Sequence, residues 1–488
     1  MLLSQLLGPE IKTPAGASQL FITGMTADSR TAAPGFVFAA LPGARADGAK
    51  FIADAVARGA VAVVAADDVV VPDWLTVPLL RVANPRRELA LMAARFYPAQ
   101  PETAVAVTGT SGKTSVAEFT RQIFKAAGKR AASVGTIGIV RPDGSVYGSL
   151  TTPDPISLHA TLAELAAEGI THLAFEASSH GLDQCRLDGV RLDAAAFTNL
   201  GRDHLDYHPT VENYFAAKMR LFEELLRPGQ PAVVNVDGAM SERVVDVARA
   251  RGLDVMTVGS MGGLLRREGV RLDGFGQIVT VRHKGGVRDV RLPLIGAYQV
   301  ENALTAAGLA IAAGIDAETA LSALESLDGV RGRLDIVGEV KGGLVVVDYA
   351  HKPEALAAAL AGVRPFVTGK LVCVFGCGGD RDRGKREIMG RIAVEGADHV
   401  IVTDDNPRSE NPAAIRAEIL KGATGAAEIG DRRAAIDAAV ASAGAGDVVI
   451  IAGKGHETGQ IVGGEVLPFS DHLEARAAIE RAGDAAHD

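Results

Sequence analysis

Short apolar runs alternate with longer amphipathic stretches along most of the chain. Runs of four to eight apolar residues flanked by glycine, proline or aspartate are typical of buried strands, and apolar residues recurring every three to four positions are typical of helices. Strands that alternate with helices build mostly parallel sheets. The predicted strands of the first two thirds of the chain are 36–41, 60–65, 105–107, 173–176, 194–198 and 232–236.

The last third repeats this alternation, with predicted strands at 344–348, 371–375, 399–403 and 447–452. Residues 265–294 instead alternate polar and apolar positions, which predicts hairpin strands added to the preceding sheet. We therefore expect an α/β protein of three domains: an N-terminal α/β domain, a central P-loop ATPase-like domain with a mostly parallel sheet, and a Rossmann-like C-terminal domain. Their expected bounds are 1–99, 100–331 and 332–488, with Pro98 and Pro101 in the first linker.

Composition and charge narrow the function classes. A chain of 488 residues with 48% hydrophobic and 22% charged residues is typical of a globular protein. The formal net charge of −9 and the lack of a dominant basic run argue against a nucleic-acid binder. The N-terminus lacks the pattern of a signal peptide, and no apolar stretch is long enough to span a membrane, so we expect a cytoplasmic protein. Three cysteines do not make a disulfide framework.

The segment 107–115, Val-Thr-Gly-Thr-Ser-Gly-Lys-Thr-Ser, indicates nucleotide binding. It lies between the predicted strand 105–107 and a predicted helix over 114–127, the setting of a phosphate-binding loop. Backbone N–H groups at such a helix N-terminus favour phosphates. We expect Lys113 to reach the terminal phosphates and the Thr114 hydroxyl to bind Mg²⁺. The general pattern has a further glycine where Val107 stands, so the loop is a shortened form.

Further polar groups follow strands of the central block. Glu176 ends an apolar strand and is a candidate Mg²⁺ ligand, although a solvated strand end is the alternative. The segment 199–208 holds two Asp, two His and an Arg, and His204 is a candidate neighbour of the metal. Lys218 lies in an amphipathic helix, where periodicity alone predicts a surface lysine.

Three turns of the last block, 376–386, 404–408 and 453–457, all follow predicted strands. The carboxyl ends of parallel strands meet at one edge of a sheet, so these turns are expected to lie together. They mix arginine with carboxylates, which suits the two charges of an amino acid. A surface ion-pair network is the alternative interpretation.

In combination these motifs resemble the Mur ligases of bacterial cell-wall synthesis, from one end of the chain to the other. The chain is similar to members that add diaminopimelate as the third residue of the stem peptide. The matching segments are 108–115, 176–180, 199–208, Asn302, Arg333 and 348–351. The resemblance implies that the first domain holds the uridine nucleotide, the second ATP, and the third the incoming amino acid.

The resemblance also assigns site residues. The implied ATP contacts are Gly109, Thr110, Ser111, Gly112, Lys113, Thr114, Ser115, Asn302, Arg333, Asp348 and His351. The implied contacts with the UDP-muramyl dipeptide are Ser29, Ala44, Arg45, Ala46, Thr151, Thr152, Ser178, Gln184 and Arg186. The implied diaminopimelate contacts are Arg381, Asp405, Asn406, Pro407, Arg408, Gly453 and Glu457.

The resemblance replaces the surface interpretation of Lys218. It implies a carbamylated lysine, N6-carboxylysine, formed from CO₂ and suited to a second Mg²⁺. Lys113, Lys218 and His204 are then the expected catalytic residues, and Thr114, Glu176, His204 and the Lys218 carbamate are the expected metal ligands. The expected cofactors are ATP and two Mg²⁺ ions.

The expected reaction phosphorylates the D-Glu γ-carboxylate of the UDP-muramyl dipeptide with ATP, and the amine of meso-diaminopimelate then attacks the acyl phosphate. Arg408 favours diaminopimelate over lysine because diaminopimelate carries an additional carboxylate. We expect a monomer that binds small molecules, with domain closure during catalysis.

The alternatives are a lysine-adding Mur ligase, a folate polyglutamate synthetase and a P-loop regulatory ATPase that binds a protein partner. The first domain argues against the folate enzyme, and no guanine-reading Asn-Lys-x-Asp motif supports a GTPase-like switch.

Overall fold

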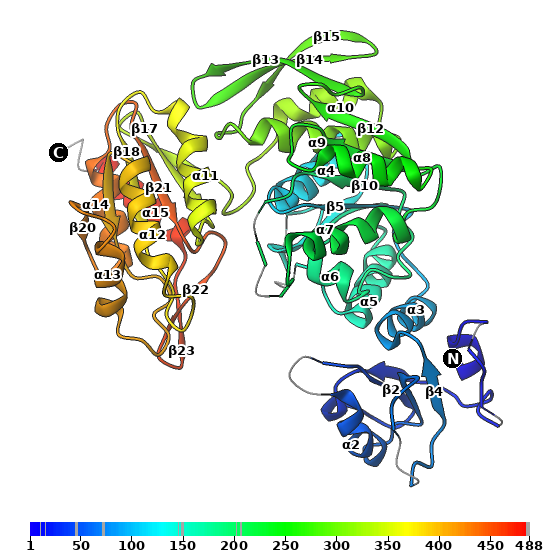
Figure 1. The fold of residues 1–488 in the computed structure, drawn as a ribbon. Coiled ribbons are helices and arrows are strands. Elements are labelled where there is room, and N and C mark those ends of the chain that lie inside the picture. The colour runs from blue at the N-terminus through cyan, green and yellow to red at the C-terminus, as the bar shows by residue number, and fades with distance from the viewer. Residues whose placement is uncertain are drawn as a thin grey trace. The chain divides into compact units, whose positions relative to one another are not determined.

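A computed structural model describes residues 1–9, 11–14, 16–43, 47–70, 74–144, 146–147, 151–201, 203–204 and 207–484. The chain forms two compact units (Figure 1). One consists of residues 1–266 and 304–320, and the other of residues 267–303 and 321–488. In the described part of the chain no helix combines the length and the apolar character that crossing a membrane requires.

The first sheet has four parallel strands in sequence order. Helix α3 follows it, and Asn84 caps this helix by accepting hydrogen bonds from the backbone N–H groups of Arg86 and Arg87. Pro85 occupies the first helical position, where its missing N–H costs nothing. The elements are α1 (Leu3–Leu6), β1 (Gly24–Thr26), β2 (Phe36–Ala40), α2 (Ile52–Ala57), β3 (Ala62–Ala66), β4 (Leu79–Val82) and α3 (Pro85–Phe96).

The second sheet has the order β15-β14-β13-β12-β11-β10-β5-β9-β6-β7-β8 among the described residues. Its strands from β12 to β6 are parallel, and β14 and β15 form the expected antiparallel hairpin. The strands are β5 (Thr103–Thr108), β6 (Ala131–Gly135), β7 (Gly138–Val140), β8 (Val146–Tyr147), β9 (His172–Glu176), β10 (Ala194–Phe197), β11 (Pro231–Asn235), β12 (Asp254–Gly259), β13 (Leu265–Asp273), β14 (Gly276–His283) and β15 (Gly286–Leu292).

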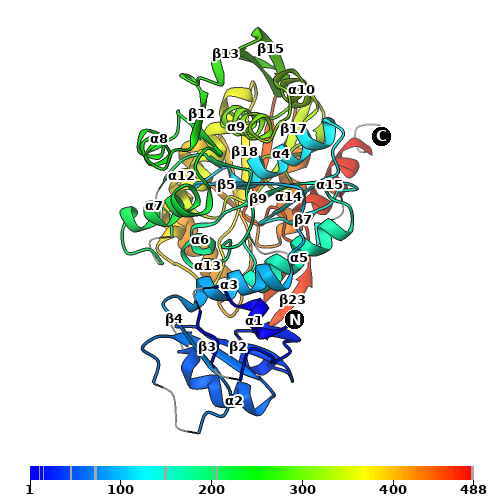
Figure 2. The same ribbon diagram turned by 90° about the vertical axis from the view of Figure 1, so that its right-hand side faces the viewer.

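Helices cover both faces of the strands next to β5. Helix α4 packs against β6 and β9, and α5 and α7 supply side chains to the core on the opposite face. Figures 1 and 2 show β5 between α4 and the layer that contains α6. The helices are α4 (Lys113–Ala126), α5 (Pro155–Ala167), α6 (Ser179–Asp183), α7 (Val211–Arg220), α8 (Ser241–Ala250), α9 (Gln299–Ala312) and α10 (Ala317–Ala323).

The third sheet has the order β16-β17-β21-β18-β19-β20, with β16 antiparallel to its neighbour. Alternate residues of β17 point to opposite faces, so Val346 packs with α11, α12 and α13 while Val345 packs with α14 and α15. The strands are β16 (Asp335–Val340), β17 (Gly343–Asp348), β18 (Leu371–Phe375), β19 (His399–Val402), β20 (Ala427–Glu428) and β21 (Val448–Ala452). The helices are α11 (Pro353–Val363), α12 (Lys385–Gly396), α13 (Pro412–Leu420), α14 (Arg432–Ser442) and α15 (Asp471–Asp484).

The predicted α/β class with mostly parallel sheets is confirmed. Every strand predicted from an apolar run is present, with ends shifted by at most two residues. A hairpin of β22 (Gly459–Val462) and β23 (Glu465–Pro468) was not predicted. Its burial pattern is exposed throughout β23, so the apolar contrast that marks a strand is weak there. Cys185, Cys373 and Cys377 are buried free thiols.

Candidate functional site

The phosphate loop connects β5 to α4, as expected. Gly109 has φ +149°, and a Cβ there would lie 1.9 Å from Thr198 Oγ1, so only glycine fits. Gly112 occupies the N-cap of α4 with φ +86° and has no side chain to cover the first N–H groups. A 14-residue helix therefore begins with backbone donors directed into the loop.

Lys113 curls back onto its own loop. Its Nζ donates to the backbone oxygens of Gly109 and Thr110, each at 2.9 Å. Thr114 is buried in the first turn of α4. The loop thus holds the Lys113 ammonium group close to the N-terminus of α4. A terminal phosphate bound there would compete with these two carbonyl groups for the ammonium group.

Lys218 is not a surface residue, so the interpretation from periodicity alone was wrong. Its side chain is 1% exposed, Nζ donates to the Gly109 oxygen at 2.7 Å, and Nζ lies 4.4 Å from the centre of the Tyr214 ring. Burial, followed by the charge of Lys113, lowers the pKa of Lys218 well below its ordinary value. The buried face of α7 therefore delivers an amine to the phosphate loop.

Glu176 is held at the end of β9 rather than solvated. Its carboxylate accepts from the backbone N of Thr136 at 2.6 Å and from Thr136 Oγ1 at 3.2 Å. A Cβ at Gly135 would lie 2.1 Å from Glu176 Oε1, so this glycine leaves room for the carboxylate. Thr151 joins the group through a 3.0 Å contact between its Oγ1 and that of Thr136.

His204 lies at a backbone position with φ +54°, in a group of rings. Its ring centre is 4.8 Å from that of His180 and 6.2 Å from that of Tyr214. Among the described residues, no three His, Cys, Asp or Glu side chains gather closely enough to hold a metal.

Four of the expected dipeptide contacts, Thr152, Ser178, Gln184 and Arg186, form one hydrogen-bonded group. Thr152 Oγ1 lies 3.0 Å from Ser178 Oγ, and Arg186 donates to the Thr152 backbone oxygen at 2.6 Å. Arg186 also donates to Gln184 Oε1 at 2.8 Å. Gln184 Nε2 in turn donates to the Tyr207 hydroxyl at 3.2 Å, so Tyr207 orients this amide.

Gln184 and Arg186 line a cavity of about 580 Å³ together with Thr26, Asp28 and Arg86. The cavity is large enough for a sizeable ligand and joins the segment after β1 to the turn after α6. Ser29, the residue after Asp28, is buried. Its hydroxyl donates to the Asp54 carboxylate and lowers the pKa of that group. The expected contacts Ala44, Arg45 and Ala46 lie outside the described residues.

The remaining expected ATP contacts belong to the second unit. Asp348 is buried and accepts from the backbone N of Leu334 and of Ala350, each at 2.8 Å, while burial raises its pKa. Asn302 donates to Gln299 Oε1 at 2.9 Å, and Gln299 donates to the Arg333 backbone oxygen at 3.3 Å.

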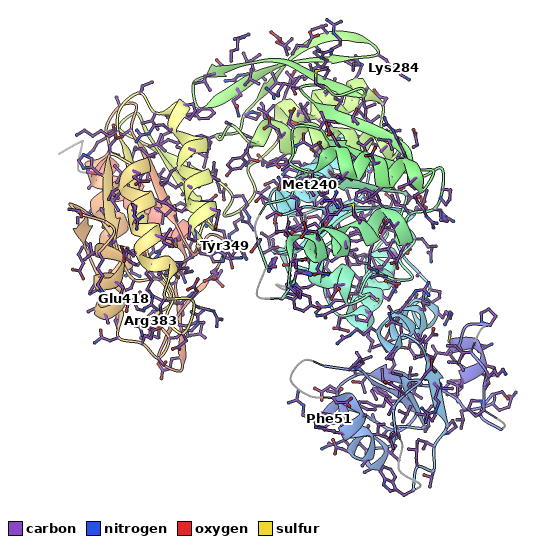
Figure 3. All side chains as sticks on the ribbon, viewed as in Figure 1. Phe51, Met240, Lys284, Tyr349, Arg383 and Glu418 are labelled. Carbon is purple, nitrogen blue, oxygen red and sulfur yellow. The ribbon has the colours of Figure 1, made fainter. Side chains whose placement is uncertain are left out.

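Tyr349 lies between two histidines of this group, and it is labelled in Figure 3. Its ring centre is 4.6 Å from that of His351 and 4.9 Å from that of His456. The Arg333 guanidinium lies 5.2 Å from the same ring centre. Burial, followed by the charge of Arg333, lowers the pKa of His456 to about 4, so this imidazole is neutral at pH 7.

The three turns of the third sheet do meet at one edge, as predicted. Asn406 Nδ2 donates to Glu457 Oε2 at 3.0 Å, which joins the turn after β19 to the turn after β21. Gly453 has φ +119°, and a Cβ there would lie 3.2 Å from Asp405 Oδ2. The expected amino-acid contacts Asp405, Asn406, Gly453 and Glu457 therefore form one cluster.

Arg381 lies in the turn after β18, and Arg408 contacts this turn from the turn after β19. Arg408 has φ +52°, and its NH1 donates to the Gly379 oxygen at 2.8 Å, which Pro407 helps to position by packing its carbonyl against Gly379. A Cβ at Gly378 would lie 2.8 Å from Arg408 NH1 and 3.9 Å from Arg381 Cγ. Arg408 thus joins the turn after β19 to the turn after β18, in which Arg381 lies.

Buried cations that support this edge were not singled out in the sequence. Arg432 is fully buried and donates to both carboxylate oxygens of Asp471, at 2.7 and 2.8 Å. Lys454 is likewise buried, in contact with Asn406 and Glu457. No periodic or spacing signal separates these residues from surface charges, because Asp471 lies 39 residues from Arg432 and Asn406 lies 48 residues from Lys454.

Arg386 is a third such cation. It is 1% exposed and bridges Glu410 and Glu418 at 2.8 Å, and Arg383 pairs with Glu418 from outside (Figure 3). The hydrogen bond from Arg386, followed by that from the Asp380 backbone N, lowers the pKa of Glu410 to about 2. These ion pairs hold the turn after β18 beside the turn after β19.

Comparison with known proteins identifies relatives along the whole chain. The family model "Mur ligase family, catalytic domain" matches residues 21–97, "Mur ligase middle domain" matches 107–310, and "Mur ligase, glutamate ligase domain" matches 332–455. A relative from Bradyrhizobium diazoefficiens, named UDP-N-acetylmuramoyl-L-alanyl-D-glutamate--2,6-diaminopimelate ligase, is 59% identical over 98% of this chain and 99% of its own length. A relative of the same name from Agrobacterium fabrum is 57% identical over 94% of this chain and 93% of its own.

Solved structures of similar fold include members of the same family. A structure of UDP-N-acetylmuramoyl-L-alanyl-D-glutamate--2,6-diaminopimelate ligase matches with a TM-score of 0.74 and 33% identity, covering 100% of this chain and 99% of that one. Folylpolyglutamate synthase from Mycobacterium tuberculosis matches with a TM-score of 0.61 over 82% of this chain and 95% of that one, and at 19% identity it shares the fold.

Proposed function

This chain belongs to the Mur ligase family, and from that premise we propose that it joins meso-diaminopimelate to UDP-N-acetylmuramoyl-L-alanyl-D-glutamate. Members of the family are ATP-dependent ligases that form amide bonds. The observation that carries the specific proposal is the edge of the third sheet, where the turns that carry Asp405 and Glu457 meet and Arg408 hydrogen-bonds to the turn that carries Arg381. Such an edge pairs with both the ammonium and the carboxylate groups of a diamino diacid.

The phosphate loop supplies the activation step. Backbone N–H groups of the loop and of the first turn of α4 bind the ATP phosphates, and Lys113 moves from its carbonyl partners to the terminal phosphate. When bound, Mg²⁺ neutralises phosphate charge, and the Thr114 hydroxyl and the Glu176 carboxylate are the side chains we expect to hold it. The loop thereby places the γ-phosphate for attack by a substrate carboxylate.

The cavity lined by Gln184 and Arg186 holds the UDP-muramyl dipeptide in this proposal. Its D-Glu γ-carboxylate attacks the γ-phosphate, which gives an acyl phosphate and ADP. The amine of diaminopimelate then attacks the acyl carbon, the amide bond forms, phosphate leaves and the amine loses its proton.

We propose further that Lys218 carries a carbamate. A neutral lysine amine adds to CO₂ and releases one proton, which yields an N-carboxylate. The position supports this, because Nζ is buried and 2.7 Å from the phosphate-loop oxygen of Gly109. The resulting anion beside Lys113 is a hard oxygen ligand, suited to a second Mg²⁺ with His204 as its neighbour.

ATP-dependent phosphate release tests the function. UDP-N-acetylmuramoyl-L-alanyl-D-glutamate is supplied with meso-diaminopimelate, with L-lysine or with no amino acid. We expect release that requires diaminopimelate. Release with lysine at equal efficiency would keep the ligase and discard the role of Arg408, and ATP turnover that needs a protein partner instead would identify a regulatory ATPase.

The proposed substrates also indicate the cellular location of the enzyme. ATP and the UDP-linked dipeptide are both cytoplasmic compounds, so we propose a cytoplasmic enzyme. We propose that it acts as a monomer, which light scattering at assay concentration tests.

A further inference from the structure

Lys454 occupies an unusual position at the edge of the third sheet. It follows β21 in the turn 453–457 and is 0% exposed. The glycines on either side of it have φ +119° and +55°. A Cβ at Gly455 would lie 2.7 Å from Tyr349 Cβ, so the turn lies tightly against its neighbours and keeps the lysine enclosed.

The ammonium group of Lys454 contacts three side chains that we assign to the amino-acid site. Nζ donates to Asn406 Oδ1 at 3.0 Å and to Glu457 Oε2 at 3.1 Å, and it lies 3.6 Å from Asp405 Oδ1. In the described part of the chain the buried Asp405 Oδ1 accepts no hydrogen bond. The nearby positive charge of Lys454 therefore compensates for the burial of this carboxylate oxygen. A lysine that is fully enclosed does not touch the substrate itself.

These contacts fix the direction of the Asn406 amide. Its Oδ1 accepts from Lys454 and also from the backbone N of Ile461 at 2.9 Å, so the oxygen faces the buried side. The Nδ2 group is then directed to Glu457 Oε2 at 3.0 Å. One cation thereby sets both the amide and the carboxylate that face the incoming amino acid.

A contribution to folding stability does not by itself explain why a lysine is buried at position 454. Burying an ammonium costs several kcal/mol by itself, and apolar side chains of similar volume often replace buried ionic groups without loss of stability. The contacts of Lys454 are also all directed to site residues rather than spread over the core. Its effect is therefore expected on the geometry of the site.

We propose that Lys454 is a positioning residue for diaminopimelate, which acts through Asn406 and Glu457. The inference rests on the proposed function. It assigns to Lys454 the alignment of the Glu457 carboxylate, the acceptor for the ammonium end of the amino acid, and of the Asn406 amide that donates to this carboxylate, while Arg408 pairs with a carboxylate of the substrate.

The test uses the full-length enzyme and the variants Lys454→Met and Lys454→Gln, where glutamine retains a donor for Asn406 if the methionine variant does not fold. We expect the KM for diaminopimelate to rise about tenfold to a hundredfold, as for the loss of a charge-assisted hydrogen bond. The KM values for ATP and for the UDP-dipeptide should stay within about twofold of wild type. Val449→Ala, a buried truncation in β21, is the control for destabilisation without a change at the site.

A double-variant cycle separates positioning from a general structural role. If Lys454 acts through Glu457, then Lys454→Met should have little further effect on the diaminopimelate KM in a Glu457→Gln background. An unchanged diaminopimelate KM in a folded Lys454 variant, additive effects in the cycle, or an equal rise of all three KM values would overturn the inference. Wild-type enzyme that releases no phosphate with diaminopimelate would instead refute the proposed function.

Discussion

The phosphate loop and the edge of the third sheet that we propose for the amino acid offer different kinds of group to a ligand. The loop is one continuous segment, and its donors are backbone N–H groups that Gly109 and Gly112 leave open. The edge is assembled from the three turns 376–386, 404–408 and 453–457, and its groups are side chains held by Lys454, Arg432 and Arg386. A site made of backbone tolerates changes of neighbouring side chains, whereas a site made of side chains depends on the ion pairs behind it.

The loop should lose most activity when Lys113, its cationic side chain, is removed. Lys113→Ala should lower the rate of phosphate release by about 10³-fold or more, because no other part of the loop supplies a mobile charge to the transferred phosphate. Steady-state phosphate release with all three substrates measures the effect. Lys125→Ala, an exposed lysine on the same helix, is the matched control and should retain full activity. Comparable losses in both variants would contradict this role of Lys113.

Adding a methyl group to the loop backbone should have the next largest effect. Gly109→Ala places a Cβ 1.9 Å from Thr198 Oγ1, so the loop must move and ATP affinity should fall by about a hundredfold. Isothermal titration with a non-hydrolysable ATP analogue measures this affinity. Gly128→Ala, at φ +76° with no atom near its added Cβ, should lower stability by about 1–2 kcal/mol because alanine is strained at positive φ, and it should leave ATP affinity unchanged. Thr198→Ala combined with Gly109→Ala should recover part of the affinity.

The edge should lose selectivity before it loses activity. Arg408→Ala should lower kcat/KM for diaminopimelate by about ten- to a hundredfold and leave that for L-lysine nearly unchanged, since lysine lacks the carboxylate that the guanidinium pairs with. The ratio of the two kcat/KM values is the readout. Arg391→Ala, an exposed arginine on α12, should leave the ratio as in wild type. An equal loss for both amino acids would show that Arg408 serves only the local fold.

The same contrast explains what could be predicted from the sequence. The strand before the loop, the loop and α4 were predicted because consecutive residues determine them, through the apolar run 105–107 and the glycines that follow. The meeting of the three turns at one edge was predicted too, because parallel strands dictate it. Lys218 was misread by periodicity, since an amphipathic pattern does not distinguish a buried amine near a carbonyl oxygen from a surface lysine.

The buried cations that support the edge could not be predicted from the sequence, for a different reason. Arg432 finds Asp471 at a separation of 39 residues, and Arg386 finds Glu410 and Glu418 at 24 and 32. Such pairings follow from the packing of α12, α13 and α15 on the sheet, which no local pattern encodes. The resemblance to a family predicts the substrate contacts, and the structure was needed to find the ion pairs that support those residues.

The smallest predicted effect concerns the pH dependence of these supports. Glu410 has a pKa of about 2 in the folded protein against an ordinary value of 4.5, because Arg386 hydrogen-bonds the ionised form. Because the pKa of Glu410 is lower in the folded protein than in the unfolded chain, its ionised carboxylate adds to the free energy of unfolding at pH values above 4.5. This contribution is lost as the pH falls from 4.5 towards 2. Urea unfolding between pH 7 and pH 3 should therefore show wild type losing more stability than Glu410→Gln, which has no such proton to take up. Glu465→Gln, on the exposed strand β23, should follow wild type over the whole range. Parallel stability curves for wild type and Glu410→Gln would mean that the ion pair does not hold the turn after β18, and that the edge depends on Lys454 and Arg432 alone.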